Sequence, residues 1–217
     1  MFTFTPIDIS TLLLRIPAAF FAIALHEMVK ARCSTWMGDP TPERSGAMSG
    51  RPFRYLEPIG FIVAIIFGFG WGRPTPTSPL YYKDRKKGIL ITYLTPSVVN
   101  LFLGFLAAFF VGILNMAQVQ AVLGAQPIIT VMAYWLFRFI FVFANVSIAI
   151  ALFNMIPVPP LDAAKLLQAA LSPNAALKMT QNEKLLQLVL MLLIVMGIIT
   201  DIIAPITNQL VSIAWNW

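Results

Sequence analysis

Charged residues are scarce in this sequence, and histidine and cysteine each occur once. Only 11% of the 217 residues are charged, whereas 59% are hydrophobic and the mean hydropathy is +0.80. This composition excludes a water-soluble globular domain of this length. The lone Cys33 excludes an internal disulfide, and the lone His26 excludes a metal site that requires two imidazoles. We therefore expect an all-α integral membrane protein.

Long apolar stretches predict the membrane spans. Each of four stretches reaches the roughly 20 residues that cross a hydrocarbon core as a helix. They cover residues 11–31, 88–116, 128–155 and 185–211. A shorter, glycine-rich stretch at 58–72 predicts a re-entrant or β-hairpin segment, with a short tilted helix as the alternative. The expected fold is a polytopic helical bundle with about four spanning helices, in a single membrane-embedded domain over 1–217.

The distribution of charge predicts the topology. The formal net charge is +6, and basic residues gather at 32–54 and 73–87, whereas 115–127 carries no charge. Because basic loops stay in the cytoplasm, we expect the N-terminus outside and both basic segments inside, in a bacterial cytoplasmic membrane. In so apolar a chain, the positive charge indicates contact with the lipid bilayer and no nucleic acid.

His26 and Glu27 are adjacent ionisable residues inside an apolar stretch, where such groups are costly. Helical metalloprotease sites read His-Glu-x-x-His, in which both histidines bind Zn²⁺ and the glutamate is the base. Here Lys30 stands at the position of the second histidine. The predicted topology also places Asp162, after a proline-rich turn, on the same inner side as His26. Asp162 is therefore a plausible further ligand.

At this point the sequence resembles the site-2 protease family of intramembrane zinc metalloproteases, peptidase family M50. The resemblance covers most of the chain and rests on an ordered set of motifs rather than on His-Glu alone. These motifs are Gly38-Asp39-Pro40-Thr41, Pro58-Ile59-Gly60, Gly68-Phe69-Gly70-Trp71 with the prolines that follow, and Asn154-Met155-Ile156-Pro157-Val158-Pro159-Pro160-Leu161-Asp162.

The resemblance implies roles for individual residues. It makes zinc the expected cofactor, His26 and Asp162 the metal ligands, and Glu27 the catalytic base. Asn100 matches a helix residue that faces the active site in the family. Asn100 therefore joins Glu27 as a candidate catalytic residue that positions substrate, with a bond to a neighbouring helix as the alternative.

The same resemblance implies a substrate-binding region. Asn154 belongs to the Asn-x-x-Pro motif, and either positions substrate or bonds a neighbouring helix. Gly70 and Trp71 belong to a segment that gates or clamps an incoming helix. The implied partner is a transmembrane helix or another membrane protein.

Departures from the family pattern centre on the metal. Lys30 replaces a zinc ligand, and Ala163 replaces the glycine after the ligand aspartate. We expect the Lys30 ammonium to occupy the volume of the metal and to pair with Asp162, Glu27 or both. Zinc would then be absent or weakly bound, and no Lewis acid would activate a water molecule for peptide hydrolysis.

Three functions follow from these observations. The first is a pseudoprotease that binds membrane helices or regulates a partner, with lost or impaired peptide hydrolysis. The second is an active intramembrane zinc metalloprotease with an atypical site. The third is a transporter-like membrane protein built on polar intramembrane residues, although the sequence shows no internal repeat.

Overall fold

A computed structural model describes residues 8–113 and 127–215. Within these ranges the regular elements are all helical, as the composition predicts. They are α1 (Ile9–Trp36), α2 (Thr41–Arg44), the 3₁₀ turn η1 (Pro52–Tyr55), α3 (Pro58–Phe67), the 3₁₀ turn η2 (Pro79–Tyr81), α4 (Arg85–Ile113), α6 (Pro127–Phe153), α7 (Asp162–Ala170), α8 (Pro173–Gln181), α9 (Glu183–Val195) and α10 (Ile198–Trp215).

Three of these helices, α1, α4 and α6, are long and apolar enough to cross a membrane. They correspond to the first three predicted spans, although residues 114–116 of the second lie outside the described part of the chain. The fourth predicted span, over 185–211, is divided between two helices. Between α9 and α10 the axis bends by 67°, and Gly197 at the break has a left-handed φ of +82°. This pair is one broken span or a re-entrant loop.

The glycine-rich segment at 58–72 contains a helix rather than a β-hairpin, and no strand occurs in the ranges that the structure describes. The side chain of Glu57 accepts a hydrogen bond from Gly60 N and caps the start of α3, which ends at the left-handed Gly68. The chain then returns in extended form along α3. A Cβ at Gly70 would lie 2.2 Å from the carbonyl oxygen of Gly60, so this close approach requires glycine. We call residues 69–78 the extended arm.

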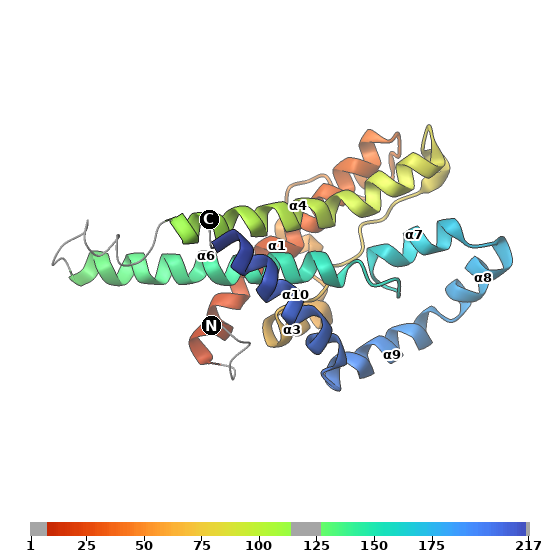
Figure 1. Ribbon diagram of the computed structural model, residues 1–217. Coiled ribbons are helices and arrows are strands. Elements are labelled where there is room, and N and C mark those ends of the chain that lie inside the picture. Colours follow the sequence, from red (N-terminus) through yellow and green to blue (C-terminus); the bar gives the residue numbers. More distant parts are fainter. Residues whose placement is uncertain (1–7, 114–126, 216–217) are drawn as a thin grey trace.

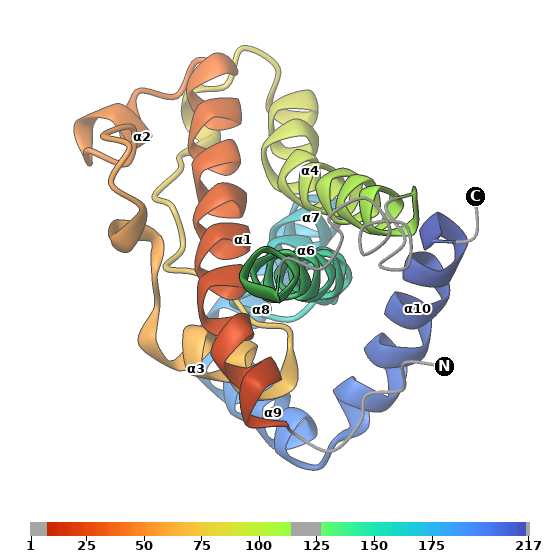
Figure 2. The same ribbon diagram turned by 90° about the vertical axis from the view of Figure 1, so that its left-hand side faces the viewer.

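Helix α6 lies at the centre of the bundle and packs against α1, α4 and α10 (Figure 2). Small side chains permit this close packing, as is common between membrane helices. Ala18, Ala19 and Ala22 of α1 are buried in one cluster with Val146 and Ile150 of α6. Beyond the end of α6, helices α7, α8 and α9 lead the chain back to α10 (Figure 1).

Asp39 fixes the loop after α1 to the end of the extended arm. Its carboxylate accepts hydrogen bonds from Ser34 Oγ (2.8 Å), Thr41 N (2.9 Å) and Ser78 N (2.7 Å). Burial disfavours ionisation of Asp39, but these hydrogen bonds outweigh it and hold its pKa below the ordinary value. The Gly-Asp-Pro-Thr motif is therefore a joint that sets the course of the arm past α1.

Candidate active site

Helix α1 carries three of the predicted site residues on neighbouring faces. His26 and Lys30 are four residues apart and Glu27 lies three residues before Lys30, so all three side chains reach the same region. Their exposed fractions are 2%, 4% and 3%. The site is thus held inside the bundle by a helix that is otherwise apolar.

Asp162 approaches these side chains from α7. It is the first residue of that helix, and the turn before it is fixed by a hydrogen bond from Ala163 N to the carbonyl oxygen of Asn154 (3.0 Å). The N-terminus of a helix favours a negatively charged side chain, because its free N–H groups carry partial positive charge. Asp162 is 4% exposed, and the structure brings it to His26 and Lys30 from 136 residues away along the chain.

Lys30 lies between the two carboxylates. Its Nζ is 2.6 Å from Glu27 Oε1 and 2.6 Å from Asp162 Oδ1. The second oxygen of Asp162 is 3.0 Å from Nε2 of His26. One ammonium group therefore pairs with two buried acids, while the imidazole contacts one of them.

The extended arm completes the cluster through Thr75, which the sequence analysis did not single out. Glu27 Oε2 accepts hydrogen bonds from Thr75 N (2.9 Å) and Thr75 Oγ1 (2.9 Å). Thr75 Oγ1 also lies 3.2 Å from the carbonyl oxygen of Glu27. Both carboxylate oxygens of Glu27 are therefore engaged, one by Lys30 and the other by the arm.

Asn100 of α4 borders the cluster and is fully buried. Its Nδ2 donates to the carbonyl oxygen of Ala22 (3.2 Å) and lies 3.5 Å from Nδ1 of His26. Its Oδ1 is buried and has no hydrogen-bond partner among the described residues. Asn100 thus contacts the helix beside it and also faces the imidazole.

The three residues predicted to bind substrate make their own contacts with other parts of the bundle. Asn154 donates from its side chain to the carbonyl oxygen of Ile150 (2.9 Å), within its own helix end. Trp71 stacks on Phe153 with ring centroids 6.1 Å apart, and Gly70 packs against α3. In this arrangement these residues hold the arm and the turn in place, and their part in substrate binding stays a prediction.

The described helices bring a histidine, a glutamate, an aspartate and a lysine together inside a bundle of candidate membrane spans. The sequence profile described as "Peptidase family M50" matches residues 16–198. A Bacillus subtilis (strain 168) protein named "Putative zinc metalloprotease YwhC" is 30% identical over 188 residues, which is 86% of this chain and 82% of that protein. No solved structure matches. The chain belongs to peptidase family M50.

Zinc is the metal that the family implies, but the side chains present do not fit it. Catalytic zinc sites use three protein ligands and a water. Here His26 and Asp162 supply two, and Lys30, a cation with no lone pair, stands at the third position. Across residues 8–113 and 127–215, no group of three or more His, Cys, Asp or Glu side chains is placed to hold a metal ion.

Proposed function

We propose that this chain is a pseudoprotease of family M50, which binds a transmembrane helix or another membrane protein without hydrolysing it. The observation that carries the proposal is the position of Lys30 Nζ, 2.6 Å from one oxygen of each buried carboxylate. The ammonium takes the place of the divalent cation between an imidazole and two acids.

Electrostatics favours this arrangement. Two carboxylates buried without a cation would carry a large desolvation penalty. A protonated lysine compensates both through short, charge-assisted hydrogen bonds. A neutral lysine would offer a lone pair to a metal, but it would leave Glu27 and Asp162 without their compensating charge. The pairing therefore opposes both deprotonation of Lys30 and binding of zinc.

The contacts of Glu27 also favour a structural role. In a zinc protease the equivalent glutamate accepts a proton from metal-bound water. Here Glu27 accepts hydrogen bonds from Lys30 and from two atoms of Thr75. The carboxylate thereby fastens the extended arm to α1 and has no free oxygen that faces a substrate.

Retention of the scaffold supports the binding half of the proposal. The family profile matches residues 16–198, and the described part of the chain contains the candidate spans. A chain that keeps most of the family sequence while it replaces a metal ligand supports a role in binding rather than in hydrolysis.

Proteolysis and association can be measured together in proteoliposomes that contain a fluorescently labelled single-span model helix. We expect the parent protein and Glu27→Gln to leave the helix intact, and Lys30→His to cleave it when zinc is supplied. Energy transfer between protein and helix should exceed the transfer seen with an unrelated helical membrane protein. Cleavage by the parent that is abolished in Glu27→Gln would identify an active protease, and transfer no higher than background would remove the helix-binding role.

A further inference from the structure

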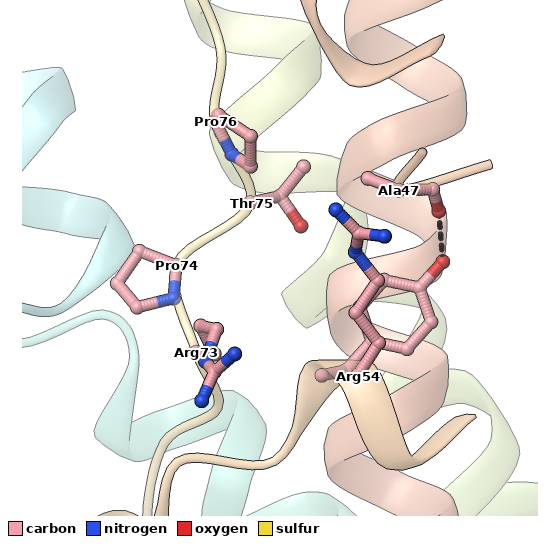
Figure 3. Close-up of a pocket in the computed structure, with 7 residues that line it drawn as sticks. Ala47, Arg54, Arg73, Pro74, Thr75 and Pro76 are labelled. Carbon is pink, nitrogen blue, oxygen red and sulfur yellow. Dashed lines mark hydrogen bonds between the residues drawn. The ribbon is translucent and has the colours of Figure 1, made fainter. Parts of the chain in front are cut away.

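A pocket of about 370 Å³ opens beside the extended arm and shares Thr75 with the charged cluster. Figure 3 shows its two walls, with the arm on one side and η1 with the loop after α2 on the other. The lining residues are Ala47, Arg54, Tyr55, Arg73, Pro74, Thr75 and Pro76. The walls are joined by a hydrogen bond from Arg73 N to the carbonyl oxygen of Tyr55 (2.8 Å), and Tyr55 Oη donates to the carbonyl oxygen of Ala47.

Two guanidinium groups and no carboxylate line this pocket. Arg54 donates to the carbonyl oxygen of Ser45. The side chain of Arg73 has neither an ion pair nor a hydrogen bond within the part of the chain that the structure describes, and it is exposed. The pocket therefore presents positive charge that nothing in its own wall neutralises.

Two acidic residues next to the pocket walls are already engaged. Glu27 lies behind Thr75, is 3% exposed and pairs with Lys30. Glu57 caps the first turn of α3 through Gly60 N. The pocket therefore has room and charge for an anion from outside the chain, and the planar fork of arginine fits the oxygen atoms of a phosphate.

An exposed aromatic residue adjoins Arg54 in the chain and contacts a candidate membrane span. Phe53, beside Arg54 on η1, is 76% exposed, and its ring lies 4.9 Å from that of Phe20 on α1. Phe21, the next residue of that helix, is 56% exposed. Exposed aromatic rings on a spanning helix contact acyl chains. Positive charge and hydrocarbon-facing surface thus meet at one place.

We propose that this pocket binds the phosphate group of an anionic phospholipid, with an acyl chain along Phe53 and Phe20. The lipid phosphate would contact both Arg73 of the extended arm and Arg54 of η1, and would thereby hold the arm against η1. Lipid binding here needs no hydrolysis, although Thr75 belongs both to the pocket and to the charged cluster.

Native mass spectrometry of the full chain in detergent, titrated with phosphatidylglycerol or phosphatidylcholine of identical acyl chains, tests the proposal. We expect the parent to bind phosphatidylglycerol more tightly than phosphatidylcholine. Arg73→Gln should lower the affinity for phosphatidylglycerol by roughly fivefold, because one basic side chain contributes about 1 kcal/mol to binding at an anionic headgroup. Arg73→Lys, which keeps the charge, should lose less of this affinity than Arg73→Gln.

The matched control is Lys86→Gln, which removes one exposed positive charge from the first turn of α4. Its lipid affinity should equal that of the parent, and thermal unfolding of each variant checks that it is folded. Equal affinity for both lipids, unchanged binding in Arg73→Gln, or an equal loss in Lys86→Gln would overturn the site. Glycerol 1-phosphate that binds as tightly as the lipid would show a site for small phosphates and would overturn the assignment to a lipid.

Discussion

Replacement of Lys30 by methionine tests the charge cluster at its centre. Methionine keeps an unbranched side chain of similar length but removes the ammonium. Glu27 and Asp162 would lose ion pairs of 2.6 Å in a region where the side chains are about 5% exposed. Loss of one partner from a buried pair costs about 3–5 kcal/mol, because the remaining charge is buried without compensation.

For a chain of this size, that loss corresponds to a decrease in melting temperature of roughly 6 to 20 °C. The measurement is thermal unfolding in detergent at neutral pH. Addition of Asp162→Asn to Lys30→Met should restore part of the loss, since it removes one of the two uncompensated acids. Lys86→Met is the control, because Lys86 is exposed and has no ion pair among the described residues.

Compensation of buried charge predicts a larger loss of melting temperature in Lys30→Met than in Lys86→Met. If Lys30→Met melted at the temperature of the parent, the ammonium would not be compensating buried charge. If Lys86→Met lost as much stability as Lys30→Met, the effect would come from net charge rather than from the buried cluster.

Three further predictions concern the arm and its joint. Thr75→Val removes the hydroxyl bond to Glu27 and should lower the free energy of unfolding by about 2 kcal/mol, measured by denaturant titration; no change would show that Glu27 does not anchor the arm. Gly70→Ala places a Cβ 2.2 Å from the carbonyl oxygen of Gly60 and should destabilise by about 1–3 kcal/mol, and unchanged melting would contradict this close packing. Because the pKa of Asp39 is lowered in the folded protein, its contribution is complete above about pH 4 and is lost as pH falls through that lowered pKa. The difference in melting temperature between the parent and Asp39→Asn should therefore shrink as the pH is lowered from about 5 to about 3, and a constant difference would refute the shift.

The sequence predicts the spans α1, α4 and α6 because a bilayer requires long apolar runs, and these runs are visible without tertiary information. It does not predict the bend at Gly197, because hydropathy continues unbroken from α9 into α10 and one glycine is a weak local signal. For a related reason the sequence offers a helix at 58–72 only as the alternative. Gly60 suggests a turn, but its use here is close contact with the returning arm.

The candidate site shows the same division between local and long-range information. The spacing of His26 and Lys30 predicts a shared helix face, and the family motif suggests Asp162 as their partner. The role of Thr75 depends on the arm passing α1 at a distance of 48 residues along the chain, which no local period encodes. The alternating Pro74 and Pro76 are the one local signal for this contact. Prolines favour an extended chain, in which the N–H group of the residue between them is free to donate to another element.

The zinc content of the purified protein is the most direct test of whether the Lys30 ammonium replaces the metal. The parent protein and Lys30→His are purified from zinc-supplemented cells, and metal per chain is determined by inductively coupled plasma mass spectrometry. We expect the parent to carry far less than one zinc ion per chain, and Lys30→His, with a third ligand restored, to carry about one. About one zinc ion per parent chain, lost in His26→Ala and in Asp162→Ala, would contradict the claim that an ammonium group replaces the metal.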